Sequence, residues 1–171
     1  MSGPLLLQRF TLISPAHEFH QQEVDLLINE GRLTRIETGG TLTPQEGYQI
    51  IQGSKNHFVS AGWVDMQCHL SDPGREKVES LTELAQAAVM GGFTHVLGYP
   101  NTQPALDSSQ MIEAVLARAT QLPISLHVCG ALTEQIKGTE LAELYDMQQA
   151  GALAFSDGDH PVTRTGTLLR A

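Results

Sequence analysis

Cysteine is scarce in this chain, which has only Cys68 and Cys129 among its 171 residues. The sequence holds no Cys-x-x-Cys pair, so neither a disulfide framework nor a thiolate metal knuckle is expected. Each cysteine lies in an apolar, strand-like run. We therefore expect two buried free thiols in a reducing, cytoplasmic compartment.

Long apolar runs are also missing, since none approaches the roughly 18 to 20 residues that a membrane-spanning helix needs. The first residues, MSGPLLLQRF, carry no charged segment ahead of a short apolar run, so no signal peptide is expected. Positive charge is sparse, with 10 lysines and arginines against 19 aspartates and glutamates, and a formal net charge of −9. This acidic balance argues against a nucleic acid or an anionic membrane surface as a partner.

What the sequence does contain is a sizeable apolar fraction, 41 %, arranged first in short β segments. The segments expected within or near residues 1–60 are 5–14, 23–28, 32–37, 48–53 and 57–66. A loop at 38–47, with three glycines and a proline, separates the third from the fourth. Short strands with turns between them predict a small β-sandwich or an open barrel, and we expect a β-sandwich flank over residues 1–60.

From about Ala61 the pattern changes to strands that alternate with helices. Helical spacing is found over 80–90, 108–121 and 138–151, and TGTLLRA at 165–171 resembles the first turn of a fourth helix. Strand-like segments precede each helix. Ser80 and Glu83 form a capping box at the first helix. A β-α-β-α-β-α-β order predicts parallel strands with right-handed crossovers.

This order fits either an open doubly wound sheet or part of a barrel. A complete eight-unit barrel takes about 250 residues, and residues 61–171 are fewer than half of that. If it is a barrel, the fold class is α/β, with the β-sandwich flank followed by the first half of a TIM (β/α)8 barrel, four βα units over 61–171.

Polar residues follow each expected strand, and in parallel α/β folds this edge of the sheet collects the chemistry. Gln67 and His69 project to one side of the first strand and Cys68 to the other. Glutamine is a poor ligand for a transition metal, so this strand offers one good ligand unless a bulge turns Cys68 inward. The remaining polar residues at this edge are Ser71, Asp72, Asn101, Thr102, Thr133, Glu134, Asp157, Asp159 and His160.

Four segments in order along the chain resemble the dihydroorotases of the amidohydrolase superfamily: VDMQCHLSDPG, GGFTHVLGYPNTQPALDS, CGALTEQIKG and AGALAFSDGDHPV. Each motif alone is weak, but the ordered set is hard to obtain by chance. The resemblance implies a TIM barrel, zinc as cofactor and a role in pyrimidine biosynthesis. The family reaction is the reversible hydrolysis of the cyclic amide of dihydroorotate to carbamoyl-aspartate.

The same resemblance implies roles for individual residues. In the family the first barrel strand carries D-x-H-x-H-x-R-x-P-G, whose histidines bind zinc and whose arginine binds the substrate carboxylate. Here Gln67 replaces the first histidine and Ser71 the arginine. The resemblance therefore leaves His69 and Asp157 as metal ligands and Asn101, in an intact P-N-T-x-P motif, as a substrate contact. No residue is assigned as catalytic.

Each assignment has a simpler alternative. His69 could be a hydrogen-bonded histidine at a strand end, Asp157 a loop aspartate that caps a turn, and Asn101 a turn asparagine between prolines. His127, inside an apolar strand, is expected to be a core histidine. Two ligands do not define a tight zinc site, in which three or four are usual.

The sequence thus predicts a dihydroorotase-like chain that is catalytically impaired by itself, because one histidine, the arginine and half of the barrel are missing. If it is active, the substrate is dihydroorotate or carbamoyl-aspartate. One alternative is a non-catalytic homologue that acts as structural partner of aspartate transcarbamoylase. Another is a longer chain whose later strands supply further histidines; an unrelated metal-free α/β binding domain is a third. A half-barrel exposes edge strands and apolar surface, so we expect a homo-oligomer.

Overall fold

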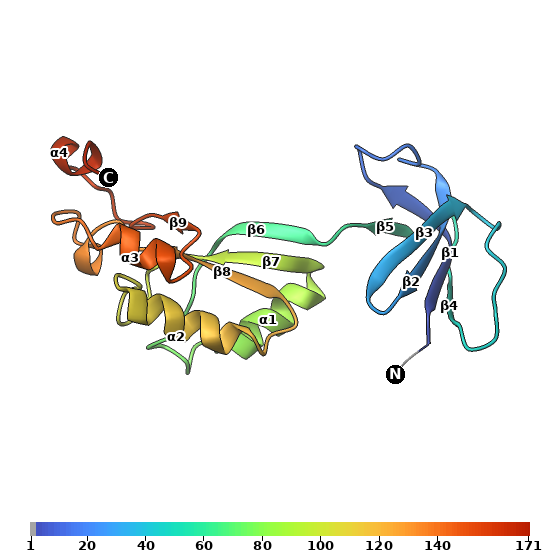
Figure 1. Ribbon diagram of the computed structural model, residues 1–171, viewed down its shortest axis with the longest axis horizontal. Helices are drawn as coiled ribbons and strands as arrows, with labels where there is room; N and C mark the ends of the chain where they lie inside the picture. Colours follow the sequence, from blue (N-terminus) through green and yellow to red (C-terminus); the bar gives the residue numbers. More distant parts are fainter. Residues whose placement is uncertain (1–2) are drawn as a thin grey trace. The chain divides into compact units, whose positions relative to one another are not determined.

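A computed structural model describes residues 3–171 of the chain. The chain divides into two compact units, Met1–Ala61 and Gly62–Ala171, and each is described by itself (Figure 1). Across the described residues, no helix combines the length and the hydropathy that crossing a bilayer requires.

The first unit is a five-stranded sheet in the order β3-β2-β1-β4, with β5 also paired to β1. Its strands are β1 (Leu5–Ile13), β2 (Glu23–Asn29), β3 (Arg32–Thr38), β4 (Gln49–Gln52) and β5 (Phe58–Ser60). The strands β1, β2 and β3 form antiparallel pairs, while β4 and β5 run parallel to β1. Leu12, Val24 and Leu26 form the buried centre of this unit.

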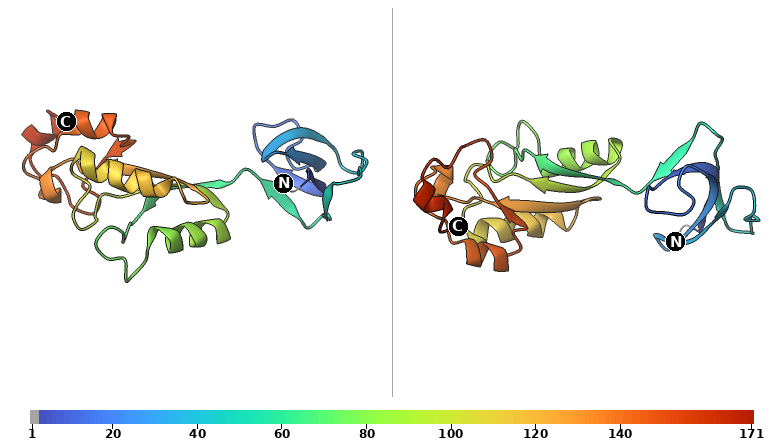
Figure 2. Two further views of the ribbon diagram at one scale, coloured as in Figure 1. Left: turned by 60° about the horizontal axis from the view of Figure 1, so that its bottom comes forward. Right: turned by 90° about the horizontal axis from the view of Figure 1, so that it is seen from above.

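The expected β flank is present as one hydrogen-bonded sheet, which agrees with the open-barrel form of the prediction. The strand β4 pairs with residues 5–8 of β1 and β5 with residues 11–13, so both occupy the same edge of one long strand. Between these halves β1 has a bulge at Arg9, whose φ is 59°. Bulges bend and twist a strand, and the resulting sheet curls strongly (Figure 2).

Asp25 holds this bulge in place. Its side chain is fully buried and accepts hydrogen bonds from the backbone N–H groups of Arg9 (2.9 Å), Gly40 (3.0 Å) and Leu42 (3.0 Å). Burial by itself raises the pKa of Asp25, but the backbone donors outweigh burial and hold the pKa below its usual value.

The second unit confirms the predicted alternation of strands and helices. Its parallel sheet has the order β6-β7-β8-β9, and α1 and α2 lie along the same face of it (Figure 1). The elements are β6 (Trp63–Cys68), α1 (Leu81–Met90), β7 (Phe93–Gly98), α2 (Ser109–Ala119), β8 (Ser125–Gly130), the 3-10 turn η1 (Glu134–Ile136), α3 (Leu144–Gln149), β9 (Ala154–Phe155) and α4 (Thr165–Leu168).

The core of the second unit lies between the sheet and its helices. Val96, Leu126 and Val128 of the strands pack there with Ile112 and Val115 of α2. The other face carries Val64 and Met66, which are 60 % and 71 % exposed. On that face, His95 and His127 stack with ring centroids 5.8 Å apart, so His127 is only half-buried and lies outside the core.

The third helix is shorter than the sequence predicts. Residues 138–143 fold back on the end of β8, where Thr133 and Leu141 form an antiparallel bridge and Ala142 N–H donates to the Leu132 carbonyl (3.1 Å). Although residues 138–143 have helical spacing, their backbone pairs with the end of a neighbouring strand and does not form a helix. The helix α3 therefore begins only at Leu144.

Candidate functional site

A hollow of about 790 Å³ lies at the carboxyl ends of the parallel strands. Its volume falls in the range of roughly 300 to 1,000 Å³ typical of small-molecule sites. The polar and charged residues that line it come from the loops after all four strands: His69, Arg75, Asn101, Thr102, Gln103, Asp107, Gln135, Asp159 and His160. Polar groups therefore converge at this edge as predicted, although some of the residues that line the hollow differ from the predicted ones.

His69 follows β6 and faces the loop after β9. Its Nε2 lies 3.5 Å from Oδ2 of Asp159, and its ring meets that of Tyr99 edge-on at 5.7 Å. The side chains of His69 and Asp159 are both more than half exposed. An exposed pair of this kind can bind a ligand or exchange a proton with solvent, because neither group is committed to the core.

Cys68 lies on the helix side of the sheet, as strand alternation predicts. A bulge does occur in β6, between Asp65 and Cys68, but Cys68 still packs against the core behind the sheet. Burial raises the pKa of the Cys68 thiol to about 11, with further contributions from the carboxylates of Asp65 and Glu79. Cys68 is therefore a protonated thiol on the helix side and does not join His69.

Asp157 is buried and bonded within the protein. One of its carboxylate oxygens accepts the backbone N–H of Thr133 (2.9 Å) and the other accepts the Thr133 hydroxyl (2.5 Å). The Thr133 hydroxyl in turn accepts the backbone N–H of Gly138 (2.8 Å). These contacts are those of the loop-capping alternative for Asp157; metal ligation by Asp157 stays a prediction.

Asn101 lies in the wall of the hollow, against the backbone of Gly158. A Cβ atom at Gly158 would come within 2.0 Å of Asn101 Oδ1, so only glycine allows this approach. The same Oδ1 atom is buried and has no hydrogen-bond partner. Leaving a buried acceptor unpaired is costly, and because Oδ1 is enclosed against Gly158, a ligand N–H group could reach it only after this loop moves.

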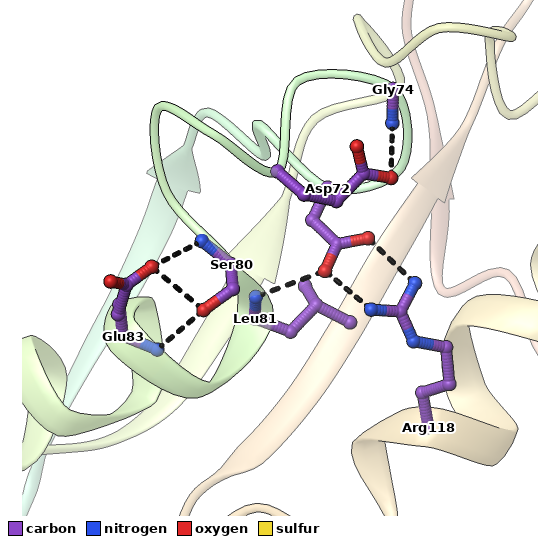
Figure 3. Close-up of polar contacts among 7 residues, drawn as sticks. Asp72, Gly74, Ser80, Leu81, Glu83 and Arg118 are labelled. Carbon is purple, nitrogen blue, oxygen red and sulfur yellow. Dashed lines mark hydrogen bonds and ion pairs between the residues drawn. The ribbon is translucent and has the colours of Figure 1, made fainter.

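Asp72 was expected at the site but is turned into the body of the unit (Figure 3). It is 1 % exposed, and its carboxylate binds both terminal nitrogens of the Arg118 guanidinium, with Arg118 Nη1 2.6 Å from Oδ1. The backbone N–H of Leu81 donates to the same carboxylate (3.2 Å). Asp72 thus ties the loop after β6 to the first turn of α1 and to the last turn of α2.

The same view confirms the predicted capping box at α1 (Figure 3). The backbone N–H of Glu83 donates to the Ser80 hydroxyl oxygen (3.3 Å), and the Ser80 N–H donates to the Glu83 carboxylate (2.8 Å). In the loop just before it, the Gly74 N–H donates to the Glu76 carboxylate (2.8 Å). These bonds fix the loop that carries Arg75 to the hollow.

Sequence reasoning missed four residues that matter here: Arg118, Asp107, Gln135 and Ile136. Arg118 was one polar residue on a helix, and its carboxylate partner is 46 positions away. Asp107 accepts the backbone N–H of Gln135 (2.9 Å) from the next loop along the chain. Such partners are set by strand adjacency, and no local pattern indicates them.

Comparison with known proteins identifies the family of the chain. A family model described as dihydro-orotase-like matches residues 56–170. The chain belongs to the dihydroorotase-like family. The resemblance seen in the four motifs is thereby confirmed.

Two dihydroorotases illustrate the relationship. The dihydroorotase of Pelotomaculum thermopropionicum is 35 % identical over 167 residues, which are 98 % of this chain and 38 % of that protein. The dihydroorotase of Anaeromyxobacter sp. is 39 % identical over 172 residues, covering 100 % of this chain and 39 % of the relative. The chain therefore spans about two fifths of the length of the curated relatives it matches.

Solved structures of the superfamily show the fold. L-hydantoinase from Arthrobacter aurescens matches with a TM-score of 0.68 and 22 % identity, over 91 % of this chain and 32 % of that one. A dihydroorotase matches with a TM-score of 0.59 and 14 % identity, over 90 % and 42 %. Their barrels are covered only in part, so the parallel sheet of the dihydroorotase-like chain is half of a TIM barrel.

Zinc is the group that the family resemblance implies, and the donor set of this dihydroorotase-like chain does not fit it. Among residues 3–171, no three histidine, cysteine, aspartate or glutamate side chains are placed together to hold a metal ion. His69 and Asp159 provide two donors, while Gln67 contributes an amide and Asp157 is bonded to Thr133. Tight zinc sites use three or four ligands, so the donors that this chain brings together do not by themselves make up such a site.

Proposed function

We propose that this dihydroorotase-like chain binds dihydroorotate or carbamoyl-aspartate in the hollow and does not interconvert them by itself. The observation that carries the proposal is the pairing of an intact recognition residue with an incomplete metal set. Asn101 lines the hollow, whereas His69 has a single carboxylate, that of Asp159, beside it. Binding and catalysis are thus separated in this chain.

Both molecules match the chemistry of the hollow. Each carries a carboxylate and N–H groups of an amide or ureido kind. Asn101 lines the hollow with an amide that can bond such groups, and Arg75, which also lines it, would bind a carboxylate in place of the arginine that Ser71 replaces.

Isothermal titration calorimetry with L-dihydroorotate and with N-carbamoyl-L-aspartate tests binding, and the ultraviolet absorbance of dihydroorotate follows its hydrolysis in the same samples. We expect measurable binding, loss of about tenfold in affinity in Asn101→Ala, and no turnover. Gln110→Ala, on the exposed side of α2, serves as the control. Turnover by the unaltered chain would refute the impaired-enzyme proposal, and absence of binding would refute the ligand assignment.

A second candidate function is that of a structural partner of aspartate transcarbamoylase in the cytoplasm. The exposed apolar side chains of the sheet favour it: Trp63, Val64 and Met66 are each at least 60 % exposed. Surfaces of this kind mark protein contacts. Homo-oligomerisation would use the same residues, and sedimentation velocity of the chain alone and mixed with aspartate transcarbamoylase separates the two. A monomer in both samples would refute both.

A further inference from the structure

Two adjacent residues in the wall of the hollow adopt a backbone conformation that side chains rarely take. Gln135 has φ 52° and ψ 21°, and Ile136 has φ 60°. Left-handed backbone is uncommon for residues other than glycine, and for a β-branched residue it is a true outlier. Such conformations persist only where the surroundings impose them, and they gather at ligand sites.

Polar groups impose this conformation from both sides. Asp107 accepts the Gln135 N–H (2.9 Å). The Thr133 hydroxyl binds Asp157 and accepts the Gly138 N–H, which fixes the beginning and the end of the turn. Asp157 and Thr133 are 3 % and 0 % exposed, so these anchors are part of the packed interior.

The turn brings its two side chains to the hollow that Asn101 also lines. Gln135 supplies an amide there, which can both donate and accept. Ile136 is the largest aliphatic side chain that lines the hollow, whose other apolar members are Pro104 and Ala105. The Gln135 amide and the apolar Ile136 side chain therefore lie side by side, on a strained segment of backbone.

We propose that Gln135 and Ile136 are the recognition element for the ligand, and that Ile136 favours the cyclic molecule over the open chain. This inference rests on the proposed function. The Gln135 amide bonds the polar edge of the ligand, while Ile136 covers the flat, partly apolar face of the dihydroorotate ring. Carbamoyl-aspartate presents no such face, so it gains less from Ile136. The buried pair of Asp157 and Thr133 acts through the turn as a positioning device.

The test compares the affinities of four proteins for L-dihydroorotate and N-carbamoyl-L-aspartate by calorimetry, together with their melting temperatures. They are the unaltered chain, Gln135→Gly, Ile136→Ala and Gln21→Gly. Gln21 is the matched control, because it is also left-handed (φ 61°) but lies in the first unit. Glycine relieves the backbone strain in both glycine variants, so neither should melt at a lower temperature.

We expect Gln135→Gly to bind both ligands about tenfold more weakly, as for loss of one hydrogen bond, and Gln21→Gly to bind as the unaltered chain does. Ile136→Ala should lose roughly fivefold for dihydroorotate and nothing for carbamoyl-aspartate. If Gln135→Gly fails to fold, Gln135→Ala tests the amide. Unchanged affinities in these variants would overturn this inference alone. No binding by the unaltered chain would overturn the proposed function, and this inference with it.

Discussion

Asp72 and Arg118 form a two-pronged ion pair between residues 46 positions apart, with the carboxylate 1 % exposed and the guanidinium side chain 53 % exposed. The carboxylate sits three positions after His69 and three before Arg75, both of which reach the hollow. The pair therefore fixes the loop that supplies one wall of the site, because it ties this loop to Arg118 of α2 in the outer helix layer.

Removing the arginine leaves Asp72 buried without its partner. We expect Arg118→Ala to lower the free energy of unfolding by about 2 kcal/mol, less than for a fully buried pair because Arg118 is half exposed. Urea denaturation followed by circular dichroism measures the change. Arg35→Ala, which breaks an exposed pair with Glu37, should cost less than about 0.5 kcal/mol. Equal effects of the two variants would contradict this view of Asp72.

Asp25 should make the first unit sensitive to acid. Its pKa in the folded chain lies below the ordinary value of 3.8, so the unfolded chain takes up the proton more readily. The stabilisation by Asp25 is complete above that value and is lost as the pH falls through the lower, folded pKa. The free energy of unfolding of the unaltered chain should therefore fall more steeply below pH 4 than that of Asp25→Asn.

At neutral pH, Asp25→Ala leaves the N–H groups of Arg9, Gly40 and Leu42 without their acceptor. We expect a loss of about 3 kcal/mol in the free energy of unfolding. Glu46→Ala, at an exposed carboxylate of the same unit, is the control and should be nearly neutral. A similar pH profile for the unaltered chain and Asp25→Asn would show that the buried carboxylate is not ionised in the way described.

Metal retention should respond to a single substitution at the end of β6. After chelation, reloading with zinc and dialysis, we expect less than one zinc per chain in the unaltered protein, since three donors are not assembled. Gln67→His adds an imidazole on the side of the strand that His69 occupies and should raise zinc affinity at least about tenfold. Gln86→His, on the exposed side of α1, should not. Stoichiometric zinc in the unaltered chain would contradict the assignment.

The cysteines should react slowly in the folded chain. Burial raises the pKa values of both thiols, that of Cys68 to about 11, so less thiolate is present than in the unfolded chain. Relative to the ordinary value of 9.0, the thiolate fraction of Cys68 near pH 8 falls by about 100-fold. Iodoacetamide labelling followed by mass spectrometry, with and without urea, measures the reaction rate of each thiol. The variant Cys68→Ser isolates the signal of Cys129. Fast labelling without urea would refute it.

Local signals predicted much of the second unit. The capping box of Ser80 and Glu83 predicts α1, and helical spacing predicts α2. The apolar runs between the helices predict the parallel strands. This order by itself allowed an open sheet or a barrel, and the resemblance to the dihydroorotases selected the half-barrel. These features depend on residues close together in the sequence, where propensity and capping act directly.

Features that depend on distant partners were not predicted. The single curled sheet of the first unit arises because β4 and β5 share one edge of β1 around the Arg9 bulge. The shortened α3 arises because residues near Leu141 pair with the end of β8. The left-handed turn at Gln135 depends on Asp107 in another loop. Each is decided by a contact whose second member no local pattern identifies.

The close approach of Gly158 to Asn101 limits which substitutions this loop tolerates. In the segment F-S-D-G-D, Gly158 leaves room for the amide of Asn101, and Asp159 directly after it places a carboxylate beside His69. Exchanging these two residues would force an aspartate side chain into the amide and remove the carboxylate from the imidazole. Positions 101, 158 and 159 are therefore constrained together, and a change at one of them requires a matching change at another.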